Sequence, residues 1–253
     1  MGVIDTKKWL EDHFYEPTTI CENMQASFDG DEPQNIYRYL SGFGMYKPSR
    51  RSKQTFEQMK ELETWSKIER IFHKYKKKWN GPDIPIYLFP FQMTWRGEEN
   101  KSGVSFPNQL FLFIGEVTDV KELEALFIHE YHHVCRIHYQ QKAIEEYTLL
   151  DSIVMEGLAE LAVKENCGEA YNASWCHLYD EDKIKQFWDK ELKEYLDVKK
   201  TEEKHDQLLY GYGRYPQMIG YNTGFHLVNS YYEKRKRKIT GKMQFTIKSE
   251  AFI

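Results

Sequence analysis

The short run HEYHH constrains this chain more than any other feature, because it sets His129, Glu130 and His133 at a fixed spacing. Four residues make about one turn of an α-helix, so both histidines would lie on one face and direct ring nitrogens at a single metal ion. Glu130 would stand beside the first ligand, where a carboxylate can contact a metal-bound water and act as general base. The apolar residues 125–128 predict that this helix is largely buried. The spacing therefore predicts a zinc-hydrolase site.

A hydrolytic zinc ion usually has three protein ligands and a water, so a third ligand must lie outside the motif. Metzincins would carry Gly and His where this chain has Arg136 and Tyr139, which excludes that class. A cysteine ligand is poorly supported, because only Cys21 precedes the motif and no matching signature surrounds it. A glutamate remains as the third ligand.

The segment MEGLAE supplies two candidate glutamates, Glu156 and Glu160, one helical turn apart on an apolar face. A carboxylate buried there needs a metal ion or a hydrogen-bond partner to offset its desolvation. We expect Glu156 to be the third ligand and Glu160 to accept a hydrogen bond from a ligand imidazole, preferably that of His129. Gly157 is costly within a helix and indicates close approach of another element, such as the metal helix.

The pattern of elements predicts one α+β domain. We find no repeat, linker or hinge, so residues 1–253 are interpreted as a single domain with a helical N-terminal region, 1–80, followed by a catalytic region, 81–253. Aromatic and β-branched residues predict strands at 84–91, where two prolines suggest an edge or a bulge, and at 109–114.

Helical periodicity predicts the two helices that carry the candidate site. The motif helix would cover residues 119–138 and open with a capping box of Asp119 and Glu122. The glutamate helix would cover residues 148–165. With few strands and many helices, the fold class is α+β.

Charge and hydropathy argue against nucleic acid and membranes as partners. The chain has 35 Lys and Arg against 39 Asp and Glu, a formal net charge of -4, which offers no overall attraction to phosphate backbones or anionic lipid. Two short basic runs, 76–78 and 234–238, are typical of solvated faces. No apolar stretch approaches the roughly 20 residues that span a bilayer, and the start lacks the apolar core of a signal peptide. We therefore expect a cytoplasmic protein. Its four cysteines are widely spaced with no CxxC pair, which argues against a cysteine zinc knuckle, and in a reducing cytosol we expect buried free thiols.

Three blocks of the sequence, HEYHHVCR, LLDSIVMEGLAE and GYNTGFHLVNSYY, resemble the YjaZ-like family of predicted zinc-dependent proteases within the gluzincin class. The resemblance covers roughly residues 100 to 235. It implies a gluzincin fold, with a small mixed sheet beside the HExxH helix and a glutamate helix, as well as bacterial cytosolic origin and peptide hydrolysis. Gluzincins carry ExxxD on the second helix, so Glu160 stands at the aspartate position as a longer carboxylate.

Peptide hydrolysis also needs a donor for the oxyanion of the tetrahedral intermediate. Gluzincins place a Tyr, His or Arg from the C-terminal part there, and Tyr221 is our preferred donor, with His226, Tyr215 and Arg214 as competitors.

An extended peptide substrate would pair with an edge of the sheet, at residues 104–106 or 109–114. The alternative to a zinc metallopeptidase is a metal-bound but noncatalytic domain that binds or senses a peptide, and a third option is hydrolysis of a nonpeptide amide. Glu130 favours hydrolysis, because a binding domain has no need of a base beside the water.

Overall fold

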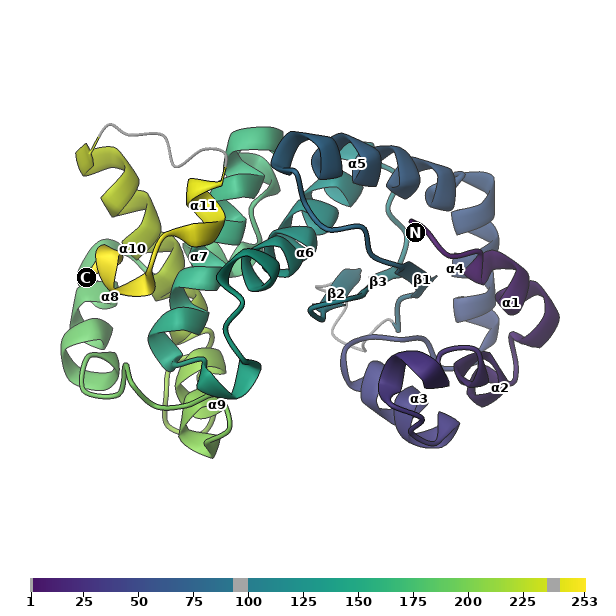
Figure 1. The fold of residues 1–253 in the computed structure, drawn as a ribbon, viewed down its shortest axis with the longest axis horizontal. Coiled ribbons are helices and arrows are strands. Elements are labelled where there is room, and N and C mark those ends of the chain that lie inside the picture. Colours follow the sequence, from purple (N-terminus) through teal and green to yellow (C-terminus); the bar gives the residue numbers. More distant parts are fainter. Residues whose placement is uncertain (1, 93–99, 236–241) are drawn as a thin grey trace. The chain divides into compact units, whose positions relative to one another are not determined.

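The computed structural model describes residues 2–92, 100–235 and 242–253 (Figure 1). Within them helices dominate and three strands form a small mixed sheet, which confirms the predicted α+β class. The chain divides into two compact units, Met1–Val134 and Cys135–Ile253. This division does not coincide with the predicted boundary after residue 80, and the single domain stays a prediction. The part of the second basic run at 236–238 lies outside the described residues.

The first unit begins with helices that precede the sheet, and the motif helix α6 runs on across the unit boundary. Its elements are α1 (Thr6–His13), α2 (Pro17–Glu22), η1 (Gln25–Phe28), α3 (Pro33–Gly42), α4 (Arg50–Glu61), α5 (Thr64–Trp79), β1 (Ile86–Pro90), β2 (Lys101–Ser105), β3 (Leu110–Ile114) and α6 (Val120–Gln140).

The sheet has the strand order β1-β3-β2, with β1 parallel and β2 antiparallel to β3. The strands expected at 84–91 and 109–114 are confirmed as β1 and β3. Pro90 fits because β1 is an outer strand of the sheet. Of the two segments expected to offer an edge, 109–114 is the central strand, so that alternative is wrong. The other segment, 104–106, overlaps β2, which like β1 is an outer strand of the sheet.

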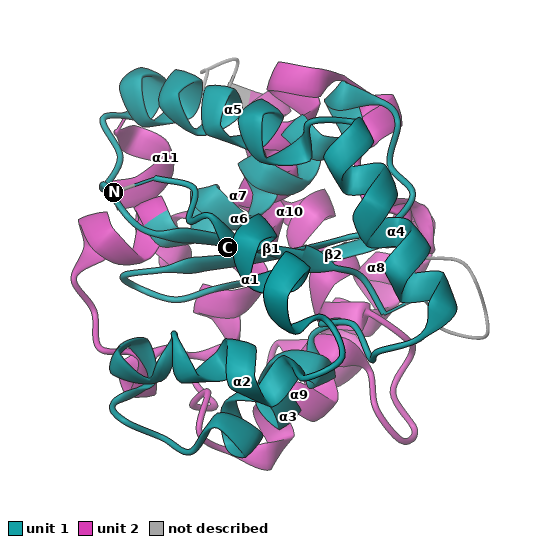
Figure 2. Cartoon of the chain, turned by 90° about the vertical axis from the view of Figure 1, so that its right-hand side faces the viewer, with its two compact units in different colours: residues 1–134 teal, residues 135–253 magenta. Residues whose placement is uncertain are grey.

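The two faces of the sheet differ in kind, because side chains alternate along each strand. One face is aromatic, and the buried core beneath it includes residues of α1, α2, α3 and α4. The aromatic residues are Tyr87, Phe89, Phe91, Phe111 and Phe113. The other face is aliphatic in β1 and β3 and is where β2 contacts Glu130 of α6. In both Figure 1 and Figure 2, α5 lies on one side of the sheet and α2 and α3 on the other.

Helix α6 is positioned by its first turn and by aromatic packing on α5. Asp119 accepts a hydrogen bond from the backbone N of Lys121 (2.8 Å), as expected of a capping residue. Glu122 differs from the expected capping box, since its Oε2 accepts a hydrogen bond from Lys101 Nζ of β2 (2.6 Å). Further along, Tyr131 stacks on Trp79 of α5, with ring centroids 6.0 Å apart.

The second unit is mainly helical. Its elements after α6 are η2 (Ile144–Glu146), α7 (Leu149–Cys167), η3 (Glu169–Tyr171), η4 (Ser174–His177), α8 (Glu181–Phe187), η5 (Trp188–Leu192), α9 (Glu203–Tyr210), α10 (Ile219–Arg235), α11 (Met243–Thr246) and η6 (Ser249–Phe252). The predicted glutamate helix is confirmed as α7, which opens with a capping box of Thr148 and Asp151.

Helix α7 is buried on all sides from Leu149 to Val163, and it crosses α10 where both helices carry a glycine. A Cβ atom on Gly157 would lie 2.1 Å from the carbonyl O of Gly224, and one on Gly224 would lie 2.0 Å from the carbonyl O of Ile153. The close approach indicated by Gly157 is therefore real, but its neighbour is α10 instead of the suggested metal helix.

The C-terminal segment is held by Arg136, a fully buried side chain of α6 that belongs to the second unit. Its Nη2 donates to the carbonyl O of Ile247 (3.0 Å) and its Nη1 to that of Gln244 (3.3 Å). None of the helices in the described part of the chain combines the length and apolar character needed to cross a bilayer.

Candidate metal centre

The two motif histidines point their ring nitrogens at one another, as the helical spacing predicts. Nε2 of His129 and Nε2 of His133 are 3.0 Å apart, and the two rings are nearly perpendicular, at 84°. His133 is buried and His129 is partly exposed. Both nitrogens can therefore face a common point at the surface of α6.

The Glu130 side chain projects from α6 toward β2, an outer strand of the sheet. It is 8% exposed, and Ser105 of β2 donates a hydrogen bond to its Oε2 at 2.5 Å. The same hydroxyl lies 2.9 Å from the backbone O of Glu130. A hydroxyl carries one proton, so it satisfies one of these acceptors at a time. This contact fixes the carboxylate against β2.

The strand passes so close to Glu130 that any larger residue at position 103 would displace the Glu130 side chain. A Cβ atom on Gly103 would lie 2.6 Å from Cγ and 2.8 Å from Oε1 of Glu130. Neither Gly103 nor Ser105 was singled out from the sequence. A glycine inside a strand indicates close approach of another group, and that signal could have identified it.

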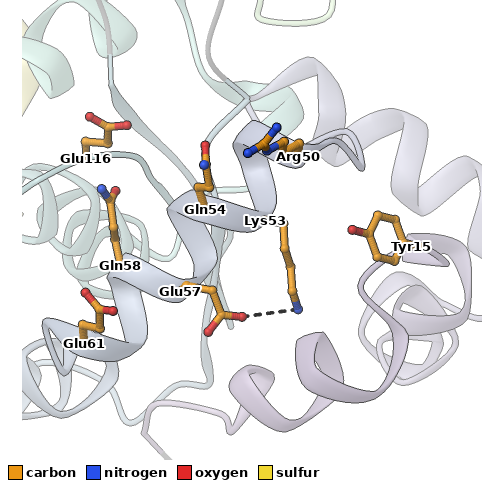
Figure 3. A pocket seen from close by; sticks show the side chains of 8 residues that line it. All are labelled: Tyr15, Arg50, Lys53, Gln54, Glu57, Gln58, Glu61 and Glu116. Carbon is orange, nitrogen blue, oxygen red and sulfur yellow. Dashed lines mark ion pairs between the residues drawn. The ribbon is translucent and has the colours of Figure 1, made fainter.

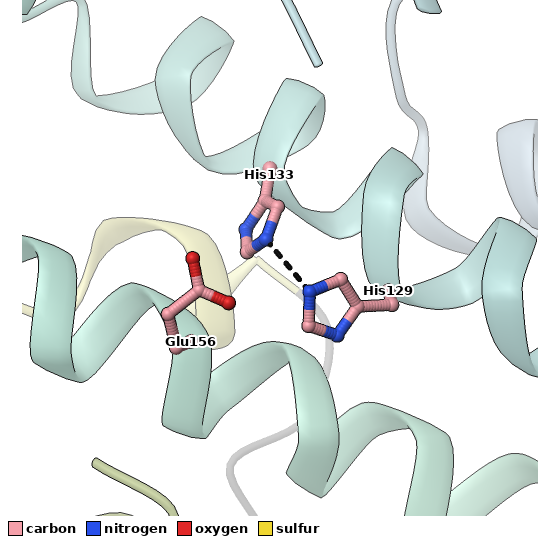
Figure 4. A group of neighbouring side chains, drawn as sticks. All are labelled: His129, His133 and Glu156. Atoms are coloured by element: carbon pink, nitrogen blue, oxygen red, sulfur yellow. Dashed lines mark hydrogen bonds between the residues drawn. The ribbon is translucent and has the colours of Figure 1, made fainter. Parts of the chain in front are cut away.

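Glu156 of α7 joins the two histidines in the group drawn in Figure 4. One ligand atom from each of the three residues lies within 4.8 Å of the others. Glu156 is 6% exposed. Of the residues singled out from the sequence as metal ligands, all three are brought together.

The donor set fits zinc by its chemistry. Two imidazole nitrogens and one carboxylate oxygen are the protein ligands of a common class of catalytic zinc site. Two nitrogens bound to one tetrahedral zinc at the usual bond length are about 3.3 Å apart, which is near the distance between the two Nε2 atoms. A buried carboxylate also matches a cation that compensates its charge.

Glu160, one turn after Glu156, is held by the loop that follows α7. Its Oε2 accepts hydrogen bonds from Nδ2 of Asn172 (2.7 Å), the backbone N of Ala173 (2.9 Å) and Sγ of Cys176 (3.4 Å). Burial, and then the charge of Glu160, raise the pKa of Cys176, which stays a thiol donor. These bonds orient the Glu160 carboxylate, and its expected role toward His129 stays a prediction.

Tyr221 of α10 belongs to an aromatic group within the second unit. Its ring contacts Trp175 edge-on, with centroids 5.0 Å apart, and lies 5.5 Å from that of Tyr210. Burial raises the pKa of Tyr210 to about 12, a hydrogen bond with Tyr221 opposes this rise, and the charge of Glu156 adds to it. The sequence missed Tyr210, which pairs with the preferred oxyanion donor and is close enough to Glu156 to sense its charge.

The competing oxyanion donors have other surroundings. Tyr215 accepts hydrogen bonds from Lys204 and from Nη2 of Arg214, which lower the pKa of its hydroxyl. Burial lowers the pKa of His226 on α10. The Tyr215 hydroxyl is therefore already engaged by two cationic donors, one of which is Arg214.

An open groove of about 550 Å³ on the first unit contains none of the predicted site residues. It follows the outer face of α4 and includes the ion pair of Lys53 and Glu57, with Tyr15 on the opposite wall (Figure 3). Its mixed charges are solvent-exposed, and we assign it no chemistry.

Comparisons with known proteins agree with the resemblance drawn from the sequence blocks. The family model described as "Predicted Zn-dependent protease (DUF2268)" matches residues 64–253, which include both site helices. The protein "Uncharacterized protein YjaZ" of Bacillus subtilis (strain 168) is 35% identical over 238 residues, covering 91% of this chain and 91% of that protein. No solved structure matches this chain. The chain therefore belongs to the YjaZ-like family of predicted Zn-dependent proteases.

Proposed function

We propose that this chain is a zinc metallopeptidase in which His129, His133 and Glu156 hold the metal ion. The observation that carries the proposal is the convergence of two imidazoles and a buried carboxylate beside a second carboxylate, Glu130, that faces the edge of the sheet. The family's description as predicted Zn-dependent proteases supports the same metal and reaction.

Zinc, when bound, makes a water more acidic and polarises the carbonyl of the scissile bond. Glu130 acts as the general base that takes the proton of the attacking water and passes it to the leaving amine. Ser105 keeps Glu130 in place in both protonation states. When Glu130 is a carboxylate, the Ser105 hydroxyl donates a hydrogen bond to its Oε2. When Glu130 is protonated, the same hydroxyl can accept a hydrogen bond from the carboxylic acid and donate its own proton to the backbone O of Glu130.

Two further residues complete the proposal. Glu160, with Oε2 held by the loop after α7, accepts a hydrogen bond from a ligand imidazole, preferably that of His129. Tyr221 donates a hydrogen bond to the oxyanion, and Tyr210 fixes its hydroxyl.

The substrate is a peptide or protein segment that pairs with β2 in extended form. All four cysteines are buried free thiols, which supports a reducing compartment such as the cytoplasm, and the Bacillus relative supports a bacterial source.

The decisive experiment combines metal analysis of the purified chain with cleavage of a peptide library. We expect one zinc per chain, and we expect Glu130→Gln to keep the zinc while reducing cleavage by roughly 10²–10⁴-fold, the usual contribution of a general base. Glu124→Gln is the matched control, since it makes the same change on the same helix at a residue that pairs with Lys74. A wild-type chain prepared without chelators that holds no zinc would contradict the metal site.

The ligand assignment is tested by zinc affinity. Glu156→Ala should release zinc, whereas Glu160→Ala should weaken binding by about 10–100-fold, as expected of a residue that orients a ligand. If Glu156→Ala holds zinc as tightly as the wild type, the third ligand lies elsewhere. If zinc-loaded wild type binds peptides but cleaves none, the noncatalytic peptide-binding alternative is correct.

A further inference from the structure

The outer edge of β2 has backbone groups directed away from the sheet. Gly115 N donates to Asn100 O and Phe106 N donates to Gln109 O, so in the antiparallel ladder the even-numbered residues of this strand bond to β3. The odd-numbered residues, Gly103 among them, therefore direct their N–H and C=O groups to the other side. No strand among the described residues pairs with that side.

The side chains of β2 divide between two faces in the same alternation. Gly103 and Ser105 lie against Glu130, on the face of the proposed chemistry. The even-numbered side chains lie on the opposite face, toward the C-terminal end of α3. There Ser102 Oγ donates to the carbonyl O of Phe43 (2.6 Å), and the ring of Phe106 lies 6.1 Å from that of Tyr39.

These contacts set the end of α3 alongside β2 and leave two aromatic rings in solvent. Tyr39 is 45% exposed and Phe43 is 38% exposed, with their ring centroids 5.0 Å apart. We call the group formed by Tyr39, Phe43 and the partly buried Phe106 the aromatic shelf. Adjacent exposed rings beside an edge strand are typical of a binding surface more than of a solvated helix.

We propose that the aromatic shelf binds large apolar side chains of an extended peptide that adds to the open edge of β2. Directly opposed residues of two paired strands project to the same face. Peptide residues opposite Ser102 and Val104 therefore contact the shelf, and the residue opposite Gly103 faces Glu130. The shelf therefore selects peptides with apolar residues on both sides of the residue that faces Glu130. This inference rests on the proposed function and names its substrate class.

The test measures binding separately from hydrolysis. The probe is a set of fluorescein-labelled alanine-based decapeptides in which one Phe is moved through each position, and the protein is the zinc-loaded Glu130→Gln chain. We expect the affinity to rise at alternate Phe positions, because a paired strand directs every second side chain to one face.

The shelf is then removed by adding Tyr39→Ala and Phe43→Ala to the Glu130→Gln chain. Affinity for the preferred Phe peptides should fall about tenfold, the effect of losing one side of an apolar contact, and affinity for the all-alanine peptide should not change. Tyr15→Ala is the matched control, since this ring is 67% exposed and lines the groove on α4. If the double variant has a lowered Tm, Tyr39→Ala alone gives the same comparison with a smaller shift.

Equal affinity of the parent and the shelf variants for the Phe peptides overturns the proposal, as does a Phe preference without alternation. Cleavage of the same peptides by the wild type is scored independently. Shelf-dependent binding without any cleavage refutes the peptidase function and supports the shelf. Cleavage that is indifferent to Tyr39 and Phe43 supports the peptidase and refutes the shelf.

Discussion

Each unit of the molecule has a glycine at which an added Cβ atom would meet a neighbour at less than 3 Å, but the kind of neighbour differs. In the first unit, a Cβ atom on Gly103 would meet the side chain of Glu130 at 2.6 Å, whereas in the second unit a Cβ atom on Gly157 would meet the backbone of Gly224 at 2.1 Å. A side chain can rotate away from an added methyl group, but a helix backbone moves only with its whole helix. Gly103 therefore maintains the proposed chemistry, and Gly157 maintains the fold.

The largest expected effect comes from Gly157→Ala. Because α7 and α10 would have to separate, we expect the free energy of unfolding to fall by about 3 kcal/mol or more, measured by urea denaturation. Gly42→Ala is the control, since its added Cβ would meet no atom within 4 Å apart from its chain neighbours and the backbone of its own helix, and it should change stability by less than about 1 kcal/mol. Equal stability of the two variants would contradict the helix crossing.

Gly103→Ala should separate chemistry from stability. The added methyl group displaces the Glu130 carboxylate, and a shift of that kind reduces kcat/KM by roughly 100-fold. Zinc content and the unfolding midpoint should remain those of the wild type. A Gly103→Ala chain that unfolds while Gly157→Ala stays folded would reverse the comparison between the two units.

Ser105→Ala should have a smaller effect of the same kind. Glu130 keeps its space but loses the hydrogen bond to Oε2, so we expect kcat to fall about tenfold with KM unchanged. Ser105→Thr keeps a hydroxyl and should recover part of the rate. Ser27→Ala, which removes a hydroxyl near Tyr87 in the same unit, is the control. A change in KM alone would assign Ser105 to substrate binding.

The same contrast explains what the sequence could predict. The spacing of His129 and His133 is a local helical property, so it was sufficient to place both ring nitrogens at one point. Glu156 could be predicted because a carboxylate in an apolar stripe needs a compensating partner. Strand β2 was largely missed, since KSGVS lacks the β-branched and aromatic run that marks β1 and β3.

Contacts that depend on the fold could not be predicted from local patterns. Ser105 and Glu130 are 25 residues apart and meet only when β2 lies against α6. A glycine at position 157 indicated that another element lies close to α7, but the sequence could not show that this neighbour is Gly224 of α10. The loop donors of Glu160, Asn172 and Ala173, follow the glutamate helix and carry no motif.

The smallest expected effect is a pH dependence of the free energy of unfolding, caused by a histidine of the second unit. His205 is fully buried, with Nε2 2.9 Å from Ser152 Oγ and Nδ1 2.8 Å from Asp206 Oδ1. Burial lowers the pKa of His205, and the hydrogen bond with Asp206 offsets only part of this shift. The unfolded chain, with an ordinary histidine pKa of about 6.5, therefore binds a proton more readily than the folded chain.

The stability from this histidine is consequently complete above about pH 6.5 and declines as the pH falls below it. Between pH 7.5 and 5.5 we expect His205 to account for a loss of at most about 1.4 kcal/mol in the free energy of unfolding. The measurement compares wild type with His205→Gln, since all other histidines contribute equally to both proteins, and His73→Gln, an exposed histidine of the first unit, is the control. An unchanged pH slope in His205→Gln would show that His205 is not the acid-sensitive group, and a flattened slope in His73→Gln would assign acid sensitivity to the first unit.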